Sequence, residues 1–518
     1  MAEQTSVLIV GGSLVGLTAS VLLGRHGVPH ILIERHRGTA IHPRAAAFHQ
    51  RTLEIFRSVG LQDAVEQAAE REFVQNGAIM AVDTLGGREL AWFYRSVNDG
   101  VEDLSPARRL FITQIGLEPV LRERAVALGA DLRYATELTG FTQDDGGVLA
   151  TIRCRDGGEE RRIRARYMIA ADGAHSPVRR ALGVDMAGRG DFAQCFTIYF
   201  KADLRDLLRG RNLSVVYVNQ PGLLAFFRFS ITADAGFLAV FATTDPGDGD
   251  DLSEGRCARL VRAALGVTAD FPVTIENVQP WTAAAATATA LRRGQVFLAG
   301  DAAHVMPPTG GFGGNTGVAD AHNLVWKLAM ALRGEAGPDL LDSYDAERRP
   351  ISALTVEQAY RRYVERVDPT LPSGDLEPNL ADTAIELGSV YRSPVIAADG
   401  PRADLVEAPE HPSGRPGTRL AHLWIEVDDA RVSTLDLAGD GFVLLAGPDG
   451  QAWTAAADRR GQLTAHRIVE DGFTTAAGLA RDGALLLRPD GVIGWRSIGA
   501  VADPDLALSD ALRRLKAR

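Results

Sequence analysis

The chain has 518 residues, too many for a single hydrophobic core, so we expect two to four domains. Hydrophobic residues make up 46% and charged residues 23% of the sequence, a composition typical of a soluble globular enzyme. The net charge of -11 argues against nucleic acid or an anionic membrane surface as the main partner.

The cysteines and the N-terminal residues indicate in which cellular compartment the protein is expected. Cys154, Cys195 and Cys257 are not in C-x-x-C spacing and cannot pair completely, so neither a disulfide scaffold nor a metal site is predicted. We expect buried free thiols in a reducing compartment. The N-terminus has no signal-peptide pattern, and no apolar run approaches the ~20 residues that span a bilayer. We predict a cytoplasmic monomer or homodimer that binds no membrane.

A strand–helix–strand unit opens the chain in the segment SVLIVGGSLVGLTASVLLGRHGVPHILIERH, residues 6–36. The apolar run 7–10 predicts a buried parallel strand, and Gly11 and Gly12 predict a tight turn. Apolar residues then recur at helical spacing until Gly27, and residues 31–33 predict a second strand ending at Glu34. The helix N-terminus can bind a pyrophosphate, and Glu34 can bind ribose hydroxyls.

The glycine pattern of this turn carries one substitution. Gly16 keeps the last position, where it lets the helix pack closely on the strand, but Ser13 stands at the middle position. The Cβ of Ser13 takes room beside the pyrophosphate, so we expect a tolerated fit at some cost in affinity. Taken alone, the pattern leaves ordinary strand–turn–helix packing open as the alternative.

The segment RYMIAADGAHSPVRRALG, residues 166–183, predicts a second strand–turn–helix. The strand ends at Asp172-Gly173, and Ser176-Pro177 opens a helix. Asp172 could face a cofactor. The alternative is a simple turn in which Ser176 caps the helix.

Residues 189–281 contain short β-rich runs that predict an antiparallel sheet. In the run GLLAFFRFS, Phe227 and Phe229 share one face, while Phe226 and Arg228 share the other. One face is expected to cover helices and the other to roof a cavity. Core packing remains the alternative for any single phenylalanine.

A glycine-dense loop follows the strand predicted at residues 296–298. Gly300-Asp301 comes first, then Gly310, Gly311, Gly313 and Gly314, and a long helix begins near Asn315. Asp301 can bind sugar-chain hydroxyls, and glycines let the backbone approach a flat ring at the positive end of the helix. A glycine-rich surface loop is the alternative.

The remainder predicts a linker and a C-terminal domain. Residues 368–416 are rich in Pro, Asp and Ala and include one short helix. Residues 485–496 read as two strands joined by a Pro-Asp-Gly turn, and a helix ends the chain. We predict these units: 1–180 and 281–367 for cofactor binding, 181–280 for substrate, 368–416 as linker and 417–518 as the last domain.

The segments GGSLVG, ADGAHSPVRR and GDAAHVMPPTGGFGGNTGVADAHNLVWKLA together resemble the class A flavoprotein aromatic hydroxylases of the para-hydroxybenzoate hydroxylase type. The likeness covers roughly the first 360 residues and is strongest to aromatic polyketide hydroxylases of antibiotic biosynthesis. It implies an α/β fold: a Rossmann-like FAD-binding domain, an inserted antiparallel-sheet substrate domain and a C-terminal thioredoxin-like domain. The last domain lacks C-x-x-C, so a redox role is not expected.

The resemblance also implies roles for individual residues. Arg44 would touch the FAD phosphates and the mobile ring, Pro308 would border the reactive face of the flavin, and these two are the catalytic candidates. Tyr217, Phe227 and Phe229 are the substrate-pocket candidates. The candidates for FAD binding are Gly11, Gly12, Ser13, Gly16, Glu34, Arg35, Arg44, Gln114, Asp172, Asp301, Pro308, Gly313, Gly314 and Asn315.

The activity implied is hydroxylation of a multi-ring phenol or quinone with FAD, NADPH or NADH, and O2, through a flavin C4a-hydroperoxide kept from water. The base stays open: His49 and His304 are candidates, and His304 is expected to be structural. A Baeyer–Villiger oxygenase and a flavin-binding protein without turnover remain alternatives. A plain NAD dehydrogenase is disfavoured, because Asp301 and its glycine loop would have no task.

Overall fold

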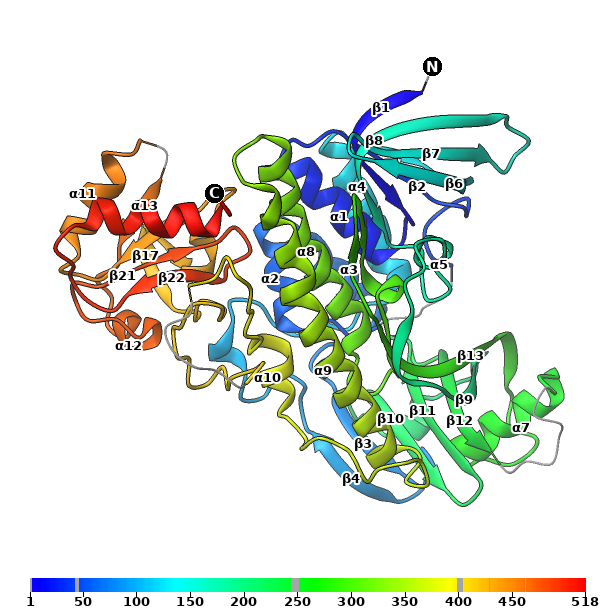
Figure 1. Cartoon of the computed structure of the whole chain (residues 1–518). Coiled ribbons are helices and arrows are strands. Elements are labelled where there is room, and N and C mark those ends of the chain that lie inside the picture. Colours follow the sequence, from blue (N-terminus) through cyan, green and yellow to red (C-terminus); the bar gives the residue numbers. More distant parts are fainter. Residues whose placement is uncertain (1, 42–45, 244–250, 398–403, 428, 462) are drawn as a thin grey trace.

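The computed structural model describes residues 2–41, 46–243, 251–397, 404–427, 429–461 and 463–518. Two long helices, α8 (Phe312–Leu332) and α9 (Asp342–Arg366), run through the middle of the molecule. Two large sheets lie on one side of these helices and the C-terminal unit on the other (Figure 1). The fold is therefore a mixed α/β fold, as predicted.

The first large sheet has a parallel centre. Its strands follow the order β14-β15-β8-β1-β2-β5, and the hairpin β6–β7 extends from β8. The central strands β1 and β8 are buried toward their carboxyl ends, at residues 7–10 and 167–170, where they share one core with α1, α4 and α8. The bounds are β1 (Glu3–Val10), β2 (His30–Ile33), β5 (Asp131–Arg133), β6 (Thr136–Asp144), β7 (Gly147–Cys154), β8 (Glu160–Ala170), β14 (Arg292–Arg293), β15 (Val296–Leu298), α1 (Leu14–Arg25) and α4 (Gln114–Ala127).

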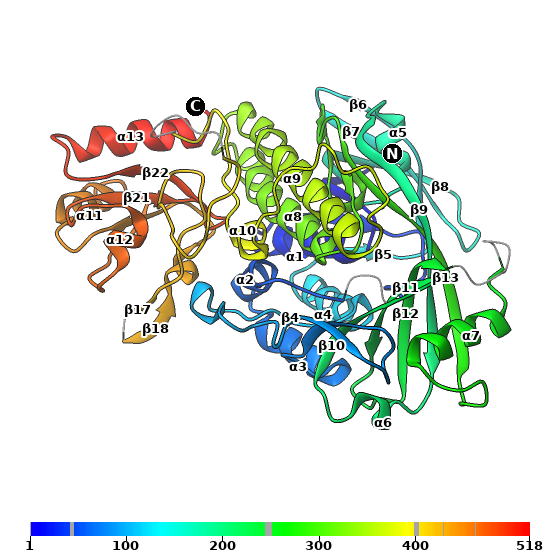
Figure 2. The same ribbon diagram turned by 90° about the horizontal axis from the view of Figure 1, so that it is seen from below.

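The second large sheet is antiparallel except where β10 pairs with β3, and its order is β16-β13-β9-β12-β11-β10-β3-β4. Helix α7 covers its outer face, and the C-terminal half of α9 lies over its inner face (Figure 2). The bounds are β3 (Ala78–Val82), β4 (Glu89–Tyr94), β9 (Met186–Lys201), β10 (Leu213–Gln220), β11 (Leu223–Phe229), β12 (Ala235–Thr243), β13 (Thr274–Ala288), β16 (His304–Val305) and α7 (Glu254–Leu265).

The C-terminal unit is built on two small sheets, β17–β18 and β20-β19-β21-β22. The hairpin predicted at residues 485–496 is present as β21 and β22. The bounds are β17 (Trp424–Val427), β18 (Ala430–Ser433), β19 (Val443–Ala446), β20 (Thr464–Arg467), β21 (Ala484–Leu487), β22 (Ile493–Ser497), α11 (Gln451–Asp458), α12 (Phe473–Ala477) and α13 (Pro504–Leu515).

Shorter helices complete the architecture. Two of them, α2 and α10, lie where the C-terminal unit, the long helices and the second sheet come together. Their bounds and those of the others are α2 (Gln50–Ser58), α3 (Gln62–Glu72), α5 (Pro177–Ala181), α6 (Arg205–Leu208) and α10 (Asp382–Leu387).

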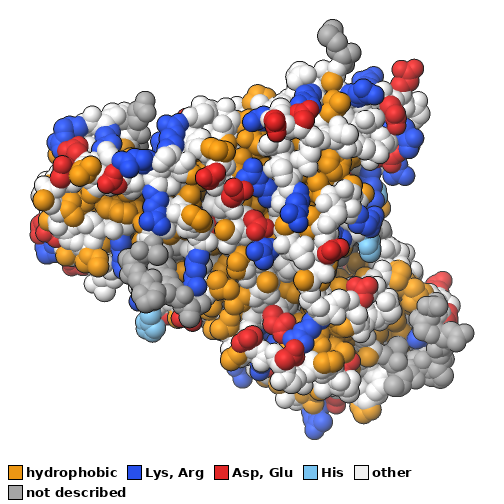
Figure 3. All heavy atoms as spheres, viewed as in Figure 1, with side chains coloured by type: hydrophobic (Ala, Val, Ile, Leu, Met, Phe, Trp, Pro, Cys, Tyr) orange, Lys and Arg blue, Asp and Glu red, His pale blue; other side chains and the backbone are white. Residues whose placement is uncertain are grey.

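One of the three cysteine thiols is exposed. Cys195 and Cys257 are buried, but Cys154 is exposed as the last residue of β7, just before the turn to β8, so the expectation of three buried thiols is wrong for Cys154. Basic and acidic side chains are interspersed on the face shown in Figure 3. No helix in the described part of the chain is both long and apolar enough to cross a membrane.

Candidate functional site

Four neighbouring parallel strands end level with one another, and each end carries a predicted site residue. Val10 pairs with Ile33 on one side and with Ala170 on the other, and Ala170 pairs in turn with Leu298. The chain continues from these strands into Gly11–Ser13, Glu34, Asp172 and Asp301. Since the carboxyl ends of parallel strands share one edge, motifs up to 290 residues apart meet along one line.

Glycines let these segments pack closely. A Cβ on Gly16 would lie 1.8 Å from the carbonyl oxygen of Gly11, so α1 can approach the turn only with glycine there. Gly11 itself has φ +108°, a backbone conformation that favours glycine. A Cβ on Gly300 or on Gly317 would lie 2.8 Å or 2.5 Å from Val15 Cγ2. Val15 thus holds the first and third motifs together.

The edge offers both donors and acceptors to a dinucleotide. Glu34 accepts hydrogen bonds from the backbone N–H groups of Gly12, at 2.7 Å, and His36, at 2.8 Å, which fixes its carboxylate beside the turn. Asp172 Oδ1 is buried and accepts no hydrogen bond from any residue that the structure describes. Burial raises the pKa of Asp172, against the opposing effect of its bonds to Ser176 and Val178.

The start of α8 forms the other wall of the site. Gly311 is the N-cap of the helix, with φ +69°, and Pro308 before it is exposed. A Cβ on Gly313 would meet only Met306 Cγ, at 3.7 Å, so this surface is open. The Asn315 side chain donates to Ala47 O, at 3.1 Å, and accepts from His49 N, at 2.9 Å, which ties α8 to the chain before α2.

These features fit FAD. The glycine turn at the N-terminus of α1 suits a pyrophosphate, and the open surface at Gly313, at the N-terminus of α8, suits a flat ring. The buried Asp172 oxygen between them is a hydrogen-bond acceptor that a hydroxyl or N–H group of the cofactor would satisfy. The donor and acceptor set therefore matches the group that the sequence motifs predict.

The two histidine candidates have different surroundings. His304 is buried, and its Nε2 lies 2.7 Å from Asp320 Oδ2, while Arg348 Nε donates to Asp320 Oδ1 at 2.8 Å. Gly300 N also donates to Asp320, at 3.0 Å. This buried cluster therefore fixes the start of the loop that follows β15. The arrangement agrees with the structural role expected of His304.

His49 instead lies directly beside the glycine loop. Its Nε2 is 3.1 Å from Gly310 O and 3.9 Å from Glu386 Oε1, and its ring meets Phe312 edge-on. Gly310 O can only accept, so Nε2 carries the proton. Burial lowers the pKa of His49, which favours the neutral ring.

The structure places two more of the predicted FAD-binding residues, Arg35 and Gln114, and does not describe a third, Arg44. Arg44 lies outside the described residues. Arg35 is exposed at the end of β2, with its Nε 3.2 Å from His36 Nε2. Gln114 begins α4 and is buried, and its Nε2 donates to Ser13 Oγ and to Glu118 Oε1, both at 3.1 Å. Glu118 was not predicted from the sequence, because no motif marks a carboxylate on a distant helix.

The pocket candidates on the second sheet fall on opposite faces. Phe227 and Phe229 are buried among the residues that pack against α7, on the outer face. Tyr217 lies on the inner face with Phe226, its register partner. The prediction that Phe227 and Phe229 line the substrate pocket is therefore wrong. Strand alternation shows which residues share a face but not which face points to the pocket, and the packing of α7 shows that their face is the outer one.

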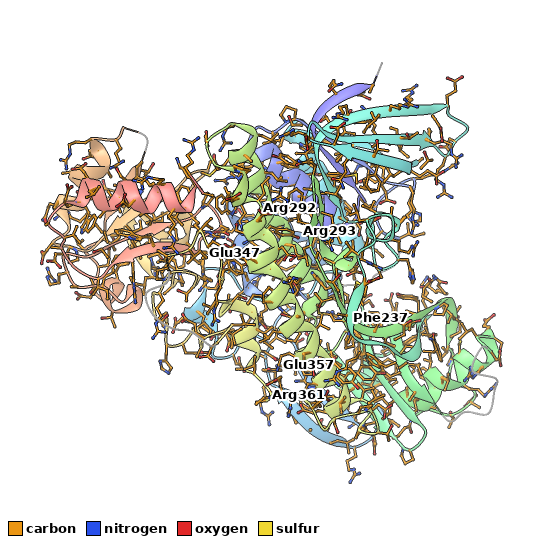
Figure 4. The ribbon with its side chains drawn as sticks, viewed as in Figure 1. Phe237, Arg292, Arg293, Glu347, Glu357 and Arg361 are labelled. Atoms are coloured by element: carbon orange, nitrogen blue, oxygen red, sulfur yellow. The ribbon has the colours of Figure 1, made fainter. Side chains whose placement is uncertain are left out.

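The inner face carries a chain of aromatic rings instead. Phe226 meets Phe237 at 5.7 Å and Phe241 at 5.6 Å between ring centroids, and Phe241 meets Tyr363 of α9 at 5.5 Å. Figure 4 labels Phe237 on this sheet, to the right of the long helices. The face is thus apolar and faces the same helices that frame the cofactor edge.

The guanidinium of Arg366 lies among these rings. The Arg366 guanidinium lies 5.6 Å from the centre of the Phe93 ring. Burial raises the pKa of Tyr217, and the charge and hydrogen bond of Arg366 oppose that rise. No sequence motif marks Arg366, which is the last residue of α9.

Comparison with known proteins identifies the family. A model of the FAD binding domain matches residues 4–359, and a model of the C-terminal region of aromatic-ring hydroxylases matches residues 413–518. A 4-methyl-5-nitrocatechol 5-monooxygenase from a Burkholderia species is 47% identical, with 99% of this chain and 98% of that protein covered. A tetracenomycin A2 monooxygenase-dioxygenase from Streptomyces glaucescens is 39% identical, with 100% and 97% covered.

Solved structures are similar over the whole length. An aklavinone-11 hydroxylase in a ternary complex with FAD and aklavinone matches with a TM-score of 0.95 and 34% identity, covering 100% of both chains. The flavin-dependent monooxygenase PieE, in complex with FAD and substrate, matches with a TM-score of 0.88 and 31% identity, covering 99% of both chains.

Proposed function

This chain belongs to the FAD-dependent aromatic-ring hydroxylases and is a flavoprotein monooxygenase, and we propose that it hydroxylates a phenol or quinone of several fused rings. One observation carries the proposal. The ends of four parallel strands lie together with the glycine-rich start of α8, and the second sheet turns an aromatic face toward the long helices. Hydroxylases of polyketides among its relatives support this class of substrate.

When bound, FAD supplies the acceptor for hydride from NADPH or NADH and the means of activating O2. The chain holds FAD through the turn at Gly11–Gly16, Glu34, Asp172 and Asp301, with Gln114 and Arg35 nearby. The backbone of Gly313, Gly314 and Asn315 directs the positive end of α8 at the ring. Pro308 borders its reacting part, and by the family resemblance Arg44 would touch the FAD phosphates and the mobile ring.

The second sheet keeps water out of the site and orients the substrate. The inner-face rings of Phe226, Phe237 and Phe241 exclude water and pack against a flat substrate. The Arg366 charge beside Tyr217 stabilises a substrate oxygen that has lost its proton. Phenol activation needs that loss, because the anion is the more electron-rich ring.

A single-ring catechol is the second candidate substrate. The 47% identity to a monooxygenase named for a methylnitrocatechol favours it, since that relative covers nearly the whole chain. The two candidates share the same site and differ in the size of the ring system that the aromatic face must accommodate.

The decisive experiment is turnover by the purified protein. We expect a yellow protein whose NADPH or NADH oxidation and O2 uptake accelerate with multi-ring phenols or quinones, giving products with one added oxygen and intact rings. Faster turnover with substituted catechols alone would select the second candidate. A ring-expanded or ring-opened product would indicate Baeyer–Villiger chemistry, and a yellow protein without turnover would indicate a non-catalytic flavin protein.

We further propose that the protein is cytoplasmic and acts as a monomer or homodimer. The reducing environment expected from the unpaired cysteines supports that location. The hydride donor is NADPH or NADH, and parallel assays with the two nucleotides decide between them.

A further inference from the structure

We infer that Glu118 positions the dinucleotide-binding turn, and that its hydrogen bond with Ser13 is what admits serine at a position usually held by glycine. The inference rests on the proposed binding of FAD and concerns how the chain prepares for it. Glu118 lies on α4, 105 residues from Ser13, and is fully buried. None of the proposed steps of hydroxylation uses it.

The Glu118 carboxylate joins three segments of the cofactor edge. Oε1 accepts hydrogen bonds from Ser13 Oγ at 2.5 Å, from Leu14 N at 3.1 Å and from Gln114 Nε2 at 3.1 Å. Oε2 accepts from Ala40 N at 2.7 Å. The turn after β1, the chain after β2 and the first turn of α4 are thereby held at one point.

Glu118 also accepts from one of the free backbone N–H groups at the start of α1. Ser13 is the N-cap of α1, but its hydroxyl makes no capping bond to the helix backbone. The N–H of Leu14, the first helical residue, donates to Glu118. A carboxylate at a helix N-terminus is stabilised by the free N–H groups and the helix dipole.

Among the described residues, the Glu118 carboxylate is stabilised by hydrogen-bond donors. Within the described residues, Glu118 forms no ion pair with Lys or Arg. Burial raises its pKa, and the hydrogen bonds from Ser13, Ala40 and Leu14 oppose that rise. Loss of one donor from a buried carboxylate leaves part of its desolvation cost uncompensated, so each donor contributes to the geometry of the turn.

The consequence for Ser13 is a fixed side-chain direction. Its hydroxyl donates to Glu118 and accepts from Gln114 Nε2 at 3.1 Å, so it is held toward α4. The backbone of the turn then keeps its place for a pyrophosphate although the residue carries a Cβ. Ser13, Gln114 and Glu118 act as one unit that replaces the missing glycine.

The test is FAD binding to apoprotein, measured by the change in flavin fluorescence on titration. The variants are Ser13→Ala, Glu118→Gln and the double variant, with Glu123→Gln as control, because Glu123 is exposed on the same helix. We expect each single variant to raise the Kd for FAD about tenfold or more and the double variant to be no weaker than Glu118→Gln alone. The control should bind like wild type.

Two results would overturn the inference: wild-type affinity in Ser13→Ala, or losses in the two single variants that multiply in the double variant. Should Glu118→Gln fail to fold, as judged by circular dichroism, the affinity of Ser13→Ala still decides. Wild-type protein that binds no FAD would instead defeat the proposed function, so the two failures are distinguishable.

Discussion

At the scale of single residues, neighbours in sequence can have unrelated roles. Phe226 and Phe227 are adjacent on β11, yet Phe226 joins the aromatic inner face and Phe227 is fully buried against the residues of α7. The alternation of strand side chains separates them, and the helix that covers each face assigns the role. This contrast gives a matched pair of substitutions.

Phe227→Ala should lower the free energy of unfolding by about 3–5 kcal/mol, because it leaves a cavity in the core. Phe226→Ala should cost less stability and mainly raise KM for the aromatic substrate. Urea unfolding and steady-state kinetics of both variants check this. The reverse assignment, with Phe226→Ala the less stable variant and Phe227→Ala the weaker binder, would contradict the placement of the two faces.

Two glycines of the cofactor edge form a second matched pair. Gly16→Ala places a Cβ 1.8 Å from Gly11 O, so the turn must move and FAD binding should be lost. Gly313→Ala meets nothing closer than Met306 Cγ, at 3.7 Å, and should leave the apoprotein as stable as wild type. It should nevertheless weaken FAD binding, because the added methyl occupies the surface proposed for the ring. Thermal unfolding and FAD titration of both variants test this; unchanged FAD affinity in Gly313→Ala would place the ring elsewhere.

At the scale of elements, α2 links the C-terminal unit to the cofactor edge. Glu54 of α2 is buried and accepts hydrogen bonds from Arg419, from Arg51 at 2.9 Å and from Ser105 at 2.6 Å. Although burial opposes it, the charges of Arg419 and Arg51 lower the pKa of Glu54 to about 2. The helix is thus held by a carboxylate that must stay ionised.

The stability of this contact should depend on pH. A pKa lowered in the folded state gives stability that is present above the ordinary value of about 4.3 and lost as pH falls through about 2. Wild type should therefore lose stability between these two pH values more steeply than Glu54→Gln, which has no such carboxylate. Urea midpoints across this range measure it, and parallel curves for the two proteins would contradict the assignment.

The elements also refine the division of the chain. β3 and β4 lie in the second sheet although both belong to the range 1–180, which we predicted for cofactor binding. The second sheet therefore takes two strands from the range predicted for cofactor binding. We propose the predicted domain boundaries with this addition to the substrate unit. The strands predicted between residues 189 and 281 are present, because their β-branched and aromatic runs are bounded by turn residues.

At the scale of the whole molecule, a buried charge network joins the C-terminal unit to the long helices. Arg488, in the β21–β22 turn, donates to Glu347 of α9 at 2.8 Å and 2.9 Å and to Asp490. Lys327 of α8 donates to Glu347 at 2.8 Å. Figure 4 labels Glu347 where the long helices face this unit. These complementary charges are buried, so a docking that left one of them without its partner would be disfavoured.

Arg488→Met should lower the free energy of unfolding by about 3–5 kcal/mol, because Glu347 and Asp490 would keep buried charges without their main partner. Arg481→Met is the matched control, since Arg481 pairs with Asp449 at the surface of the same unit and should cost about 0–1 kcal/mol. Calorimetry measures both. Equal effects of the two substitutions would contradict a structural role for the network.

The local patterns of the chain were enough to predict the elements around the cofactor edge, and the family resemblance added FAD and the residue roles. Apolar periodicity, turn glycines and the spacing of acidic residues after strands depend on near neighbours, so the amino-acid sequence alone predicts the βαβ unit, the Asp172 turn and the α8 loop. The antiparallel sheet and the last hairpin followed from the same kind of signal.

Packing between distant elements decided the rest: which face of β11 points inward, that Arg366 stands beside Tyr217, and that Glu118 of α4 holds Ser13. The two side-chain contacts join residues more than 100 positions apart. No local pattern encodes which side chain a distant helix will bring against another, because that choice depends on how the helices and sheets pack together.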